Sequence, residues 1–256
     1  MASSPATSLE AIVDLLSAAR KLAVMTGAGM SAESGIPTFR GKQDGLWAQF
    51  DPQQLATPDA YRADQALVWG WYRWRTALVE RASPNAGHRA IAALENVKPG
   101  LVVVTQNVDD LHERAGSRDV IHLHGSLFSP RCFACERSYA RSPASNTADP
   151  APELRVEPPK CLHCGGPVRP GVVWFGEQLP KGPWARAEHV IADCDVLLVV
   201  GTSGVVQPAA SLPRHAKQMG KPIVEVNPEA SAITPIADIF YREKAAEALA
   251  EVVAAL

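Results

Sequence analysis

The fold of this chain is decided by one segment, Thr26-Gly27-Ala28-Gly29-Met30-Ser31-Ala32-Glu33-Ser34-Gly35-Ile36-Pro37-Thr38-Phe39-Arg40. An apolar run at residues 22–25 precedes it and predicts a buried strand that leads into a tight glycine turn. Gly27 and Gly29 allow the backbone to bend sharply and to approach a ligand without a Cβ atom in the way. The N–H groups of such a turn, and of a helix that follows it, favour phosphate. We therefore expect a site for a phosphorylated ligand and, more specifically, for a dinucleotide.

An ordinary dehydrogenase does not account for this segment, and strand-to-glycine turns also occur without any ligand. A dehydrogenase would have a second strand that ends in an acidic residue about 20 residues later, whereas residues 41–47 have the composition of a loop. Pro37 would interrupt a long helix at this point. We interpret Phe39 and Arg40, which are adjacent on this loop, as a mobile cover over a flat ligand.

The composition limits the class of protein. The 256 residues are 46% hydrophobic and 20% charged, with a formal net charge of -2. These values are typical of a soluble globular protein and give no electrostatic reason to expect binding to nucleic acid or to an anionic membrane. No apolar run approaches the 18 or so residues of a membrane span, and residues 1–5 lack the start of a secretion signal. We expect a cytoplasmic monomer with neither nucleic acid nor membrane as a partner.

Strand-like and helix-like segments alternate along the chain. The predicted strands are residues 22–25, 101–105, 120–125, 172–177, 196–200 and 223–226. The predicted helices are residues 8–20, 66–80, 84–94, 185–192, 209–218 and 244–256. This alternation predicts an α/β fold with a doubly wound, parallel, Rossmann-like sheet. We expect the sheet domain to comprise residues 1–128 and 171–256, with a helical insert at about 44–82 and a smaller module inserted at 129–170.

Four of the five cysteines form two pairs, Cys132-x-x-Cys135 and Cys161-x-x-Cys164, inside the predicted module. Each pair suits a short knuckle that presents two thiolates to one tetrahedral ion, and Gly165-Gly166 follows the second pair. The alternative is two redox-active or incidental pairs. Four thiolates complete the ligand shell of Zn²⁺, so we expect a structural zinc with no open position for water.

Polar residues follow two of the predicted strands. Residues 106–112 come after the strand at 101–105, at the carboxyl edge where ligands bind in open α/β sheets. His122 and His124 are two residues apart, so on a strand they lie on one face. One alternative is that the two histidines bind a metal, and another is that they are structural, as strand histidines more often are. His124, however, ends the strand beside Gly125. A histidine with a pKa near 6.5 is a competent base at neutral pH, which makes His124 a candidate base.

Seven motifs, in the same order along the chain, resemble those of the sirtuins, the NAD-dependent protein-lysine deacylases. They are Gly27–Arg40, Thr105–Asp109, His122–Gly125, the two cysteine pairs, Val172–Glu177, Gly201–Ser203 and Asn227–Glu229. In that family these correspond to the cofactor loop, the ribose and nicotinamide segment, the catalytic motif, the zinc module, the strand that pairs with substrate peptide, and two further NAD-contacting turns. The resemblance therefore implies NAD as cosubstrate, one structural zinc, and acylated lysines of proteins as partners.

The resemblance also implies a role for individual residues. Asn107, Asp109 and His124 would be catalytic, with His124 as the base. The implied cofactor contacts are Gly27, Ala28, Gly29, Ser31, Ala32, Glu33, Pro37, Thr38, Phe39, Arg40, Trp47, Gln106, Asn107, Val108, Asp109, Gly201, Thr202, Ser203, Asn227, Pro228, Glu229 and Ala245. The implied substrate contacts are Ala56, Tyr72, Arg75, Val173, Trp174, Phe175 and Gly176. The implied zinc ligands are Cys132, Cys135, Cys161 and Cys164.

The mechanism that the resemblance implies is physically reasonable. The acyl-lysine carbonyl oxygen attacks the ribose of NAD as nicotinamide leaves, and Asn107 and Asp109 supply orientation. His124 then deprotonates a ribose hydroxyl, which attacks the imidate carbon. Phe39 shields the reacting atoms from water. The products are nicotinamide, free lysine and O-acyl-ADP-ribose.

Tyr72 and Arg75 refine the expected substrate. They are three residues apart on the predicted helix and share a face. An ordinary amphipathic helix with a snorkelling arginine is the alternative. The pair resembles the Tyr-x-x-Arg of the sirtuin subgroup that removes succinyl and malonyl groups, and Ala56 resembles the small residue that widens its acyl pocket. A guanidinium can bind a distal carboxylate through two hydrogen bonds, and a phenol can add a third.

We therefore expect a deacylase that removes succinyl, malonyl and acetyl groups. Two other functions remain open at this point. An ADP-ribosyltransferase on the same fold would use NAD without needing an acyl pocket, and Tyr72 and Arg75 argue against it. A non-catalytic module that binds acyl-lysine would not need a base, and His124 beside Asn107 and Asp109 argues against it.

Overall fold

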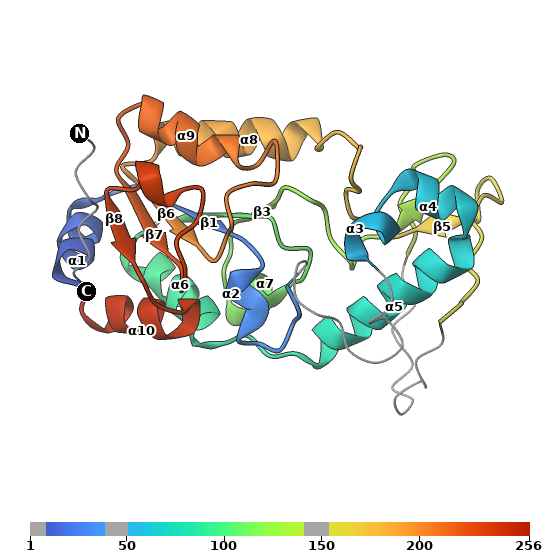
Figure 1. Ribbon diagram of the computed structural model, residues 1–256, viewed down its shortest axis with the longest axis horizontal. Coiled ribbons are helices and arrows are strands. Elements are labelled where there is room, and N and C mark those ends of the chain that lie inside the picture. Colours follow the sequence, from blue (N-terminus) through green and yellow to red (C-terminus); the bar gives the residue numbers. More distant parts are fainter. Residues whose placement is uncertain (1–8, 39–50, 141–153) are drawn as a thin grey trace.

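The computed structural model describes residues 9–38, 51–140 and 154–256 (Figure 1). Its centre is a six-stranded sheet in the order β3-β2-β1-β6-β7-β8, in which every neighbouring pair is parallel. The strands are β1 (Leu22–Thr26), β2 (Val102–Thr105), β3 (Val120–His122), β6 (Val196–Val200), β7 (Ile223–Val226) and β8 (Ile239–Tyr241). The chain order changes direction beside β1, because β2 and β3 lie on one side of it and β6 to β8 on the other. The predicted doubly wound sheet is confirmed.

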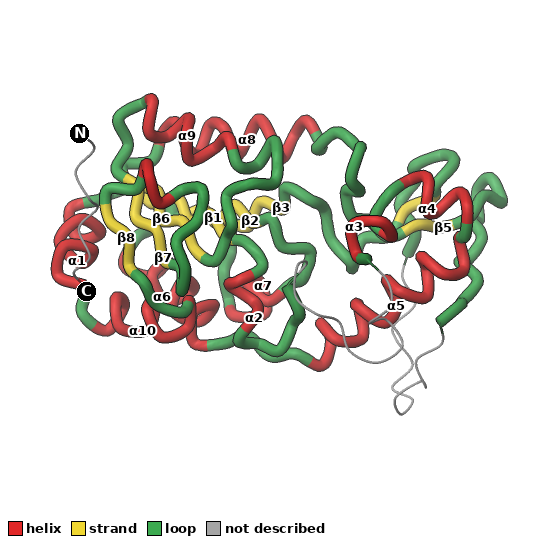
Figure 2. Tube along the Cα trace, viewed as in Figure 1, coloured by secondary structure: helices red, strands yellow, loops and turns green. Residues whose placement is uncertain are grey.

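Helices cover both faces of this sheet (Figures 1 and 2). The helices are α1 (Leu9–Ala18), α2 (Gly29–Ala32), α3 (Pro52–Leu55), α4 (Pro58–Ala63), α5 (Gln65–Arg81), α6 (Ala86–Val97), α7 (Leu111–Ala115), α8 (Lys181–Asp193), α9 (Ser211–Gln218) and α10 (Ala245–Ala254), with a 3-10 turn, η2, at Thr234–Ile236. One face packs against α1, α6 and α10, and the other packs against α8 and α9.

The continuous apolar runs of the sequence are explained by this two-sided cover. Successive side chains of a strand point to opposite faces, so in β1 Leu22 and Val24 join the core under α1, α6 and α10, whereas Ala23 and Met25 join the core under α8 and α9. All five residues of β1 are buried, as are all five of β6. Cys194, between α8 and β6, is buried at 2% exposure, as expected for a small core residue.

A second lobe, formed by α3, α4, α5 and a two-stranded antiparallel ribbon, lies beyond the end of β3 (Figure 1). The ribbon pairs β4 (Arg131–Cys132) with β5 (Val168–Arg169). Its aromatic core contains Tyr61, Trp71 and Trp174, which are 0–1% exposed. Tyr61 donates to the carbonyl of Val168 at 2.6 Å, so the core joins the helices to the ribbon. Trp71 comes from α5, so this core also fixes the helix that carries Tyr72 and Arg75.

Two predicted strands differ from the structure. The segment Val172–Glu177 is not a strand, because its hydrogen bonds go to separate loops: Val173 N donates to His124 O at 2.8 Å and Phe175 N to Ala56 O at 2.9 Å. A turn at Gly176 then reverses the chain, with φ +87°. β3 ends at His122, so His124 lies in the turn after the strand, and the same-face argument for the two histidines does not hold.

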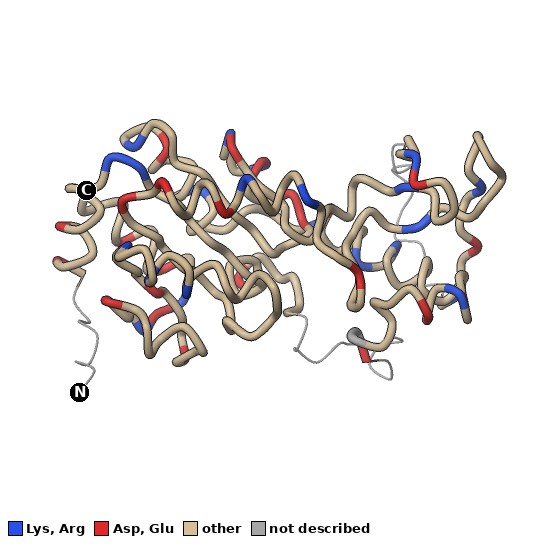
Figure 3. Tube along the Cα trace, turned by 90° about the horizontal axis from the view of Figure 1, so that it is seen from above, with Lys and Arg blue, Asp and Glu red and all other residues tan. Residues whose placement is uncertain are grey.

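Basic and acidic residues are interspersed along the chain (Figure 3). Within the described ranges, the longest apolar helix falls short of what a membrane crossing requires.

Candidate active site

A cleft of about 610 Å³ lies at the carboxyl ends of β1, β2 and β6, and part of its wall comes from α5 of the second lobe. Most of the residues predicted to bind cofactor or substrate line it. They are Gly27, Ala28, Gly29, Ser31, Pro37, Thr38, Ala56, Tyr72, Arg75, Gln106, Asn107, Val108, Asp109, His124, Val173, Trp174, Phe175, Gly176, Gly201, Thr202 and Ser203. Residues from distant parts of the chain therefore meet at the edge where parallel sheets bind ligands.

The remaining predicted residues lie elsewhere. Asn227, Pro228 and Glu229 line an adjoining hollow of about 450 Å³, which shares residues 201–203 with the cleft. Ala32, Glu33 and Ala245 line neither space. Glu33 instead accepts a hydrogen bond from Ala246 N at 2.8 Å, at the first turn of α10. Phe39, Arg40 and Trp47 lie outside the described residues.

The two glycines of the first turn are needed for contact with another turn of the protein. Gly27 N donates to Val200 O at 3.0 Å, and Gly29 N donates to Gly201 O at 2.8 Å. A Cβ atom on Gly27 would lie 2.7 Å from the Cβ of Thr202, and one on Gly29 would lie 2.7 Å from the Cα of Gly201. Neither glycine has a positive φ. The lack of a side chain at these glycines was predicted to let a ligand approach the backbone. It also lets the turn after β6 pack closely against the turn after β1.

Ser31, Asn107 and Asp109 form a buried polar cluster at the cleft. Ser31 Oγ donates to Asp109 Oδ2 at 2.9 Å, and Asn107 Nδ2 donates to Ser31 Oγ at 3.1 Å. Asn107 N also donates to Thr105 Oγ1 at 3.0 Å. Burial raises the pKa of Asp109, although hydrogen bonds from Leu111 N and Ser31 oppose this. The cluster holds the asparagine and the aspartate in fixed positions, as binding of a polar ligand requires.

His124 has one ring nitrogen committed to the backbone. Its Nδ1 lies 3.0 Å from the carbonyl oxygen of Gln106, which can only accept, so Nδ1 carries the hydrogen. The neutral ring therefore has its lone pair on Nε2. Burial lowers the pKa of His124 below its usual 6.5, and the bond to Gln106 opposes this only in part. A neutral imidazole beside a cleft is suited to remove a proton.

Tyr72 and Arg75 line the cleft from α5, and Ala56 lines it from the segment before α4. Tyr72 is 4% exposed and Arg75 8% exposed. Trp174 Nε1 donates to the Tyr72 hydroxyl at 3.0 Å. Burial raises the pKa of Tyr72 and lowers that of Arg75, and the arginine partly offsets the effect on the tyrosine. A cationic side chain and a phenol are thus brought together in a partly apolar pocket, as the spacing on the helix predicts.

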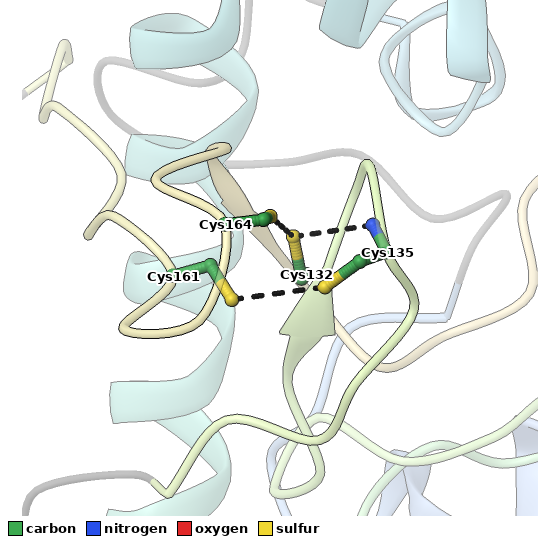
Figure 4. Close-up of side chains that lie close together, drawn as sticks. All are labelled: Cys132, Cys135, Cys161 and Cys164. Carbon is green, nitrogen blue, oxygen red and sulfur yellow. Dashed lines mark hydrogen bonds between the residues drawn. The ribbon is translucent and has the colours of Figure 1, made fainter.

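The four paired cysteines form one cluster in the second lobe (Figure 4). Their sulfur atoms all lie within 4.8 Å of one another. Cys132 Sγ is 3.4 Å from Cys164 Sγ, and Cys135 Sγ is 3.8 Å from Cys161 Sγ, so each knuckle faces the other. Four converging thiolates are the donor set of a closed structural zinc site, and the residues present fit that ion.

The sequence did not indicate every residue of the cleft. The additional lining residues are Ile36, Val172, Glu177, Leu179, Val205, Val206, Gln207 and Pro208. Four of these directly follow Gly204, just beyond the predicted turn at 201–203. The position of that turn at the carboxyl end of β6 was the available signal, because a loop that leaves a strand there borders the same space.

Sequence comparison links this chain to enzymes of known class. A family model described as the Sir2 family matches residues 27–208. The NAD-dependent protein deacylase 1 of Pseudomonas aeruginosa is 57% identical over 221 residues, which are 86% of this chain and 88% of that protein. The NAD-dependent protein deacylase 2 of Pyrobaculum aerophilum is 52% identical over 242 residues, which are 94% of this chain and 93% of that protein.

Solved structures show the same relationship. A Sir2 homologue in complex with NAD superposes with a TM-score of 0.89 at 47% identity, over 98% of this chain and 94% of that one. A Sir2 protein with a deacetylated p53 peptide and 3'-O-acetyl ADP-ribose superposes with a TM-score of 0.79 at 31% identity, over 96% of this chain and 97% of that one.

Proposed function

This chain belongs to the Sir2 family and is an NAD-dependent protein deacylase, and from this premise we propose that it removes succinyl and malonyl groups from lysine as well as acetyl groups. The observation that carries the proposal is the position of Tyr72 and Arg75, both buried and both lining the cleft. An acetyl group has no distal carboxylate for a guanidinium to bind. A guanidinium that lines the cleft can bind a carboxylate through two hydrogen bonds, so Arg75 in this place favours an acyl group with a distal carboxylate.

The hydrogen bond from Trp174 strengthens the proposal. Because the Tyr72 oxygen accepts from the indole N–H, the phenol hydrogen is directed to another acceptor. A carboxylate held by Arg75 would provide that acceptor. Ala56 contributes little volume to the wall, which leaves room for an acyl chain longer than acetyl.

We propose the following roles for the residues of the cleft. NAD supplies the ADP-ribosyl group that accepts the acyl group, with release of nicotinamide. Asn107 and Asp109 orient the nicotinamide and ribose end through the cluster that they form with Ser31. His124 removes a proton from a ribose hydroxyl through Nε2, and the bond to Gln106 O keeps that nitrogen unprotonated. The residues at 227–229 hold the adenosine end in the adjoining hollow.

The chain also carries a structural zinc site, formed by Cys132, Cys135, Cys161 and Cys164. Four thiolates leave no open coordination position, so the ion takes no part in the chemistry. We further propose that residues 129–170 form a module distinct from the sheet domain of residues 1–128 and 171–256. Finally, we propose that the enzyme acts as a monomer in the cytoplasm, where reduced cysteines would keep this site intact.

Substituting Arg75 by methionine should separate substrate choice from catalysis. The change removes the charge and keeps much of the apolar stem. A hydrogen bond to a charged group contributes about 1.5–3 kcal/mol, which corresponds to a loss of roughly 10- to 150-fold in kcat/KM for a succinyl-lysine peptide. The rate on the matched acetyl-lysine peptide should change little, or improve as the pocket becomes less polar.

Tyr72→Phe is the matched variant, since it removes one hydroxyl and keeps the ring. It should show the same asymmetry in weaker form. Equal losses on both peptides in the Arg75→Met variant would make Arg75 a structural residue and remove the basis for the desuccinylase assignment. The assignment of the chain as a deacylase would survive that result.

The pH dependence of kcat/KM should identify the base. His124 acts in its neutral form, so activity should be lost as the pH falls through its pKa. Burial lowers that pKa, which places the midpoint of the acidic limb below 6.5. The pKa of His122 is shifted in the opposite direction: burial lowers it, but Glu113, the bond to Asn107 O and the charge of Asp109 together outweigh burial and raise it overall. An acidic limb with its midpoint above 6.5 would therefore point to His122 as the base.

A further inference from the structure

Two histidines form hydrogen bonds to two consecutive backbone carbonyl groups of the segment that follows β2. His124 Nδ1 lies 3.0 Å from Gln106 O, and His122 Nδ1 lies 3.1 Å from Asn107 O. A carbonyl oxygen only accepts hydrogen bonds, so each ring donates from Nδ1. The end of β3 is thereby attached to the backbone that carries Asn107 and Asp109.

The two rings differ at their second nitrogen. His122 Nε2 lies 2.6 Å from Oε1 of Glu113, on α7. A carboxylate also only accepts, so the His122 ring has an acceptor at both nitrogens. This geometry is the one that an imidazolium would satisfy. His124 donates from Nδ1 alone and is neutral.

The other charged and titratable groups around His122 are compatible with this charge. Asp109, after β2, is the second carboxyl group that faces the ring. His112, on α7, is 1% exposed, and its pKa lies well below 6.5 because of burial, so it adds no second positive charge. At the far end of β3, Asp119 pairs with Arg186 of α8. The His122 side chain is 19% exposed and that of Glu113 is 42% exposed, so the pair lies at the edge of the protein with its histidine turned inward.

We propose that His122 is a positioning residue for deacylation, which as an imidazolium bridges Asn107 O and Glu113 and so fixes the backbone that carries Asn107 and Asp109. Loss of the Nε2 hydrogen would remove the bond to Glu113 and release the ring from α7. The enzyme then needs His122 charged and His124 neutral at the same time. This requirement predicts a bell-shaped pH dependence of kcat/KM, with His124 setting the acidic limb and His122 the basic limb. The inference rests on the deacylase activity and does not depend on the acyl preference.

The test is the Glu113→Gln variant, assayed for kcat/KM on an acetyl-lysine peptide across pH. The new amide oxygen can still accept from Nε2, but the negative charge is gone. A carboxylate at this distance favours a histidine cation by about 1 to 3 pH units, so the midpoint of the basic limb should fall by that amount while the acidic limb stays in place. Glu10→Gln is the control, because Glu10 is an exposed residue on α1 and should leave both limbs unchanged.

Two further measurements decide whether His122 is the group that titrates. In the ring nitrogen NMR spectrum of the unmodified enzyme at pH 7, His122 should show both nitrogens protonated, whereas His124 should show Nδ1 only. In the His122→Gln variant, the basic limb should disappear, because no titrating ring remains. The proposal is overturned by a neutral His122 at pH 7, by a basic limb that persists in His122→Gln, or by a Glu113→Gln profile that is lowered equally at every pH.

Discussion

The His124→Ala variant should lose about 100- to 10,000-fold in kcat while it remains folded and continues to bind NAD. The neutral ring supplies the only proton acceptor that we assign to the ribose hydroxyl, and alanine has none. The loss of the bond to Gln106 O removes one attachment of an otherwise well-packed turn. Steady-state rates on an acetyl-lysine peptide, the Kd for NAD and the midpoint of thermal unfolding together separate a chemical defect from a folding defect.

His189→Ala is the matched control, because His189 is an exposed histidine on α8 and lies outside the cleft. Its kcat should equal that of the unmodified enzyme. Turnover within a few-fold of normal in His124→Ala would show that another group removes the proton. His122 would then become the candidate base, and its assignment as a positioning imidazolium would fail with it.

The Cys161→Ser variant should lose zinc and stability together. Each thiolate of a closed tetrahedral site contributes to metal binding, and the binding free energy of a structural zinc is part of the folding free energy. Metal analysis should find about one zinc per chain in the unmodified protein and much less in the variant. The midpoint of thermal unfolding should fall, and deacylation should fall with it, because the ribbon that contains Cys132 packs against the aromatic core that also includes Tyr72.

Cys194→Ser controls for the chemical change itself. Cys194 is buried outside the cluster, and its Sγ donates to Ile191 O at 3.2 Å, a bond that a serine hydroxyl can also form. This variant should keep its zinc. A stable, active and metal-free preparation of the unmodified protein would contradict a structural role for the ion.

Much of the sheet could be predicted because its strands are buried on both faces and therefore form continuous apolar runs. β1 and β6 illustrate this, with all five residues of each buried. The carboxyl ends of such strands share one edge, which is why residues 106–109 could be predicted to lie at a ligand site from the sequence alone. Residues 201–203 were added to the site by the resemblance to the sirtuins. The cysteine spacing was equally informative, since two knuckles of this kind suit a tetrahedral ion.

The remaining features depend on contacts between residues that are distant in sequence. Val172–Glu177 has the composition of a strand, but its backbone N–H groups donate to two different loops. Glu33 lies in the segment that resembles the cofactor loop, and no local pattern predicts that its carboxylate accepts from Ala246 N at the start of α10. The ion pair of His122 and Glu113 was not predicted either, because no local pattern specifies how α7 packs beside β3. The periodicity of apolar residues predicts which face of a helix or strand is buried. It does not predict which other element packs against that face.

The contact between the turn after β1 and the turn after β6 affects how this architecture can evolve. A Cβ atom on Gly27 would lie 2.8 Å from Gly201 O, and one on Gly29 would lie 2.7 Å from Gly201 Cα, so a larger residue at either position would push the two turns apart. A descendant of this enzyme that had lost all use for NAD would still be constrained to keep these glycines in order to fold. Its freedom to vary would lie instead at Asn107, Asp109 and His124. When a genome is searched for working enzymes of this kind, we therefore expect the glycine pattern alone to retrieve inactive descendants as well. If the roles proposed above hold, those three polar positions are the ones that separate the two groups.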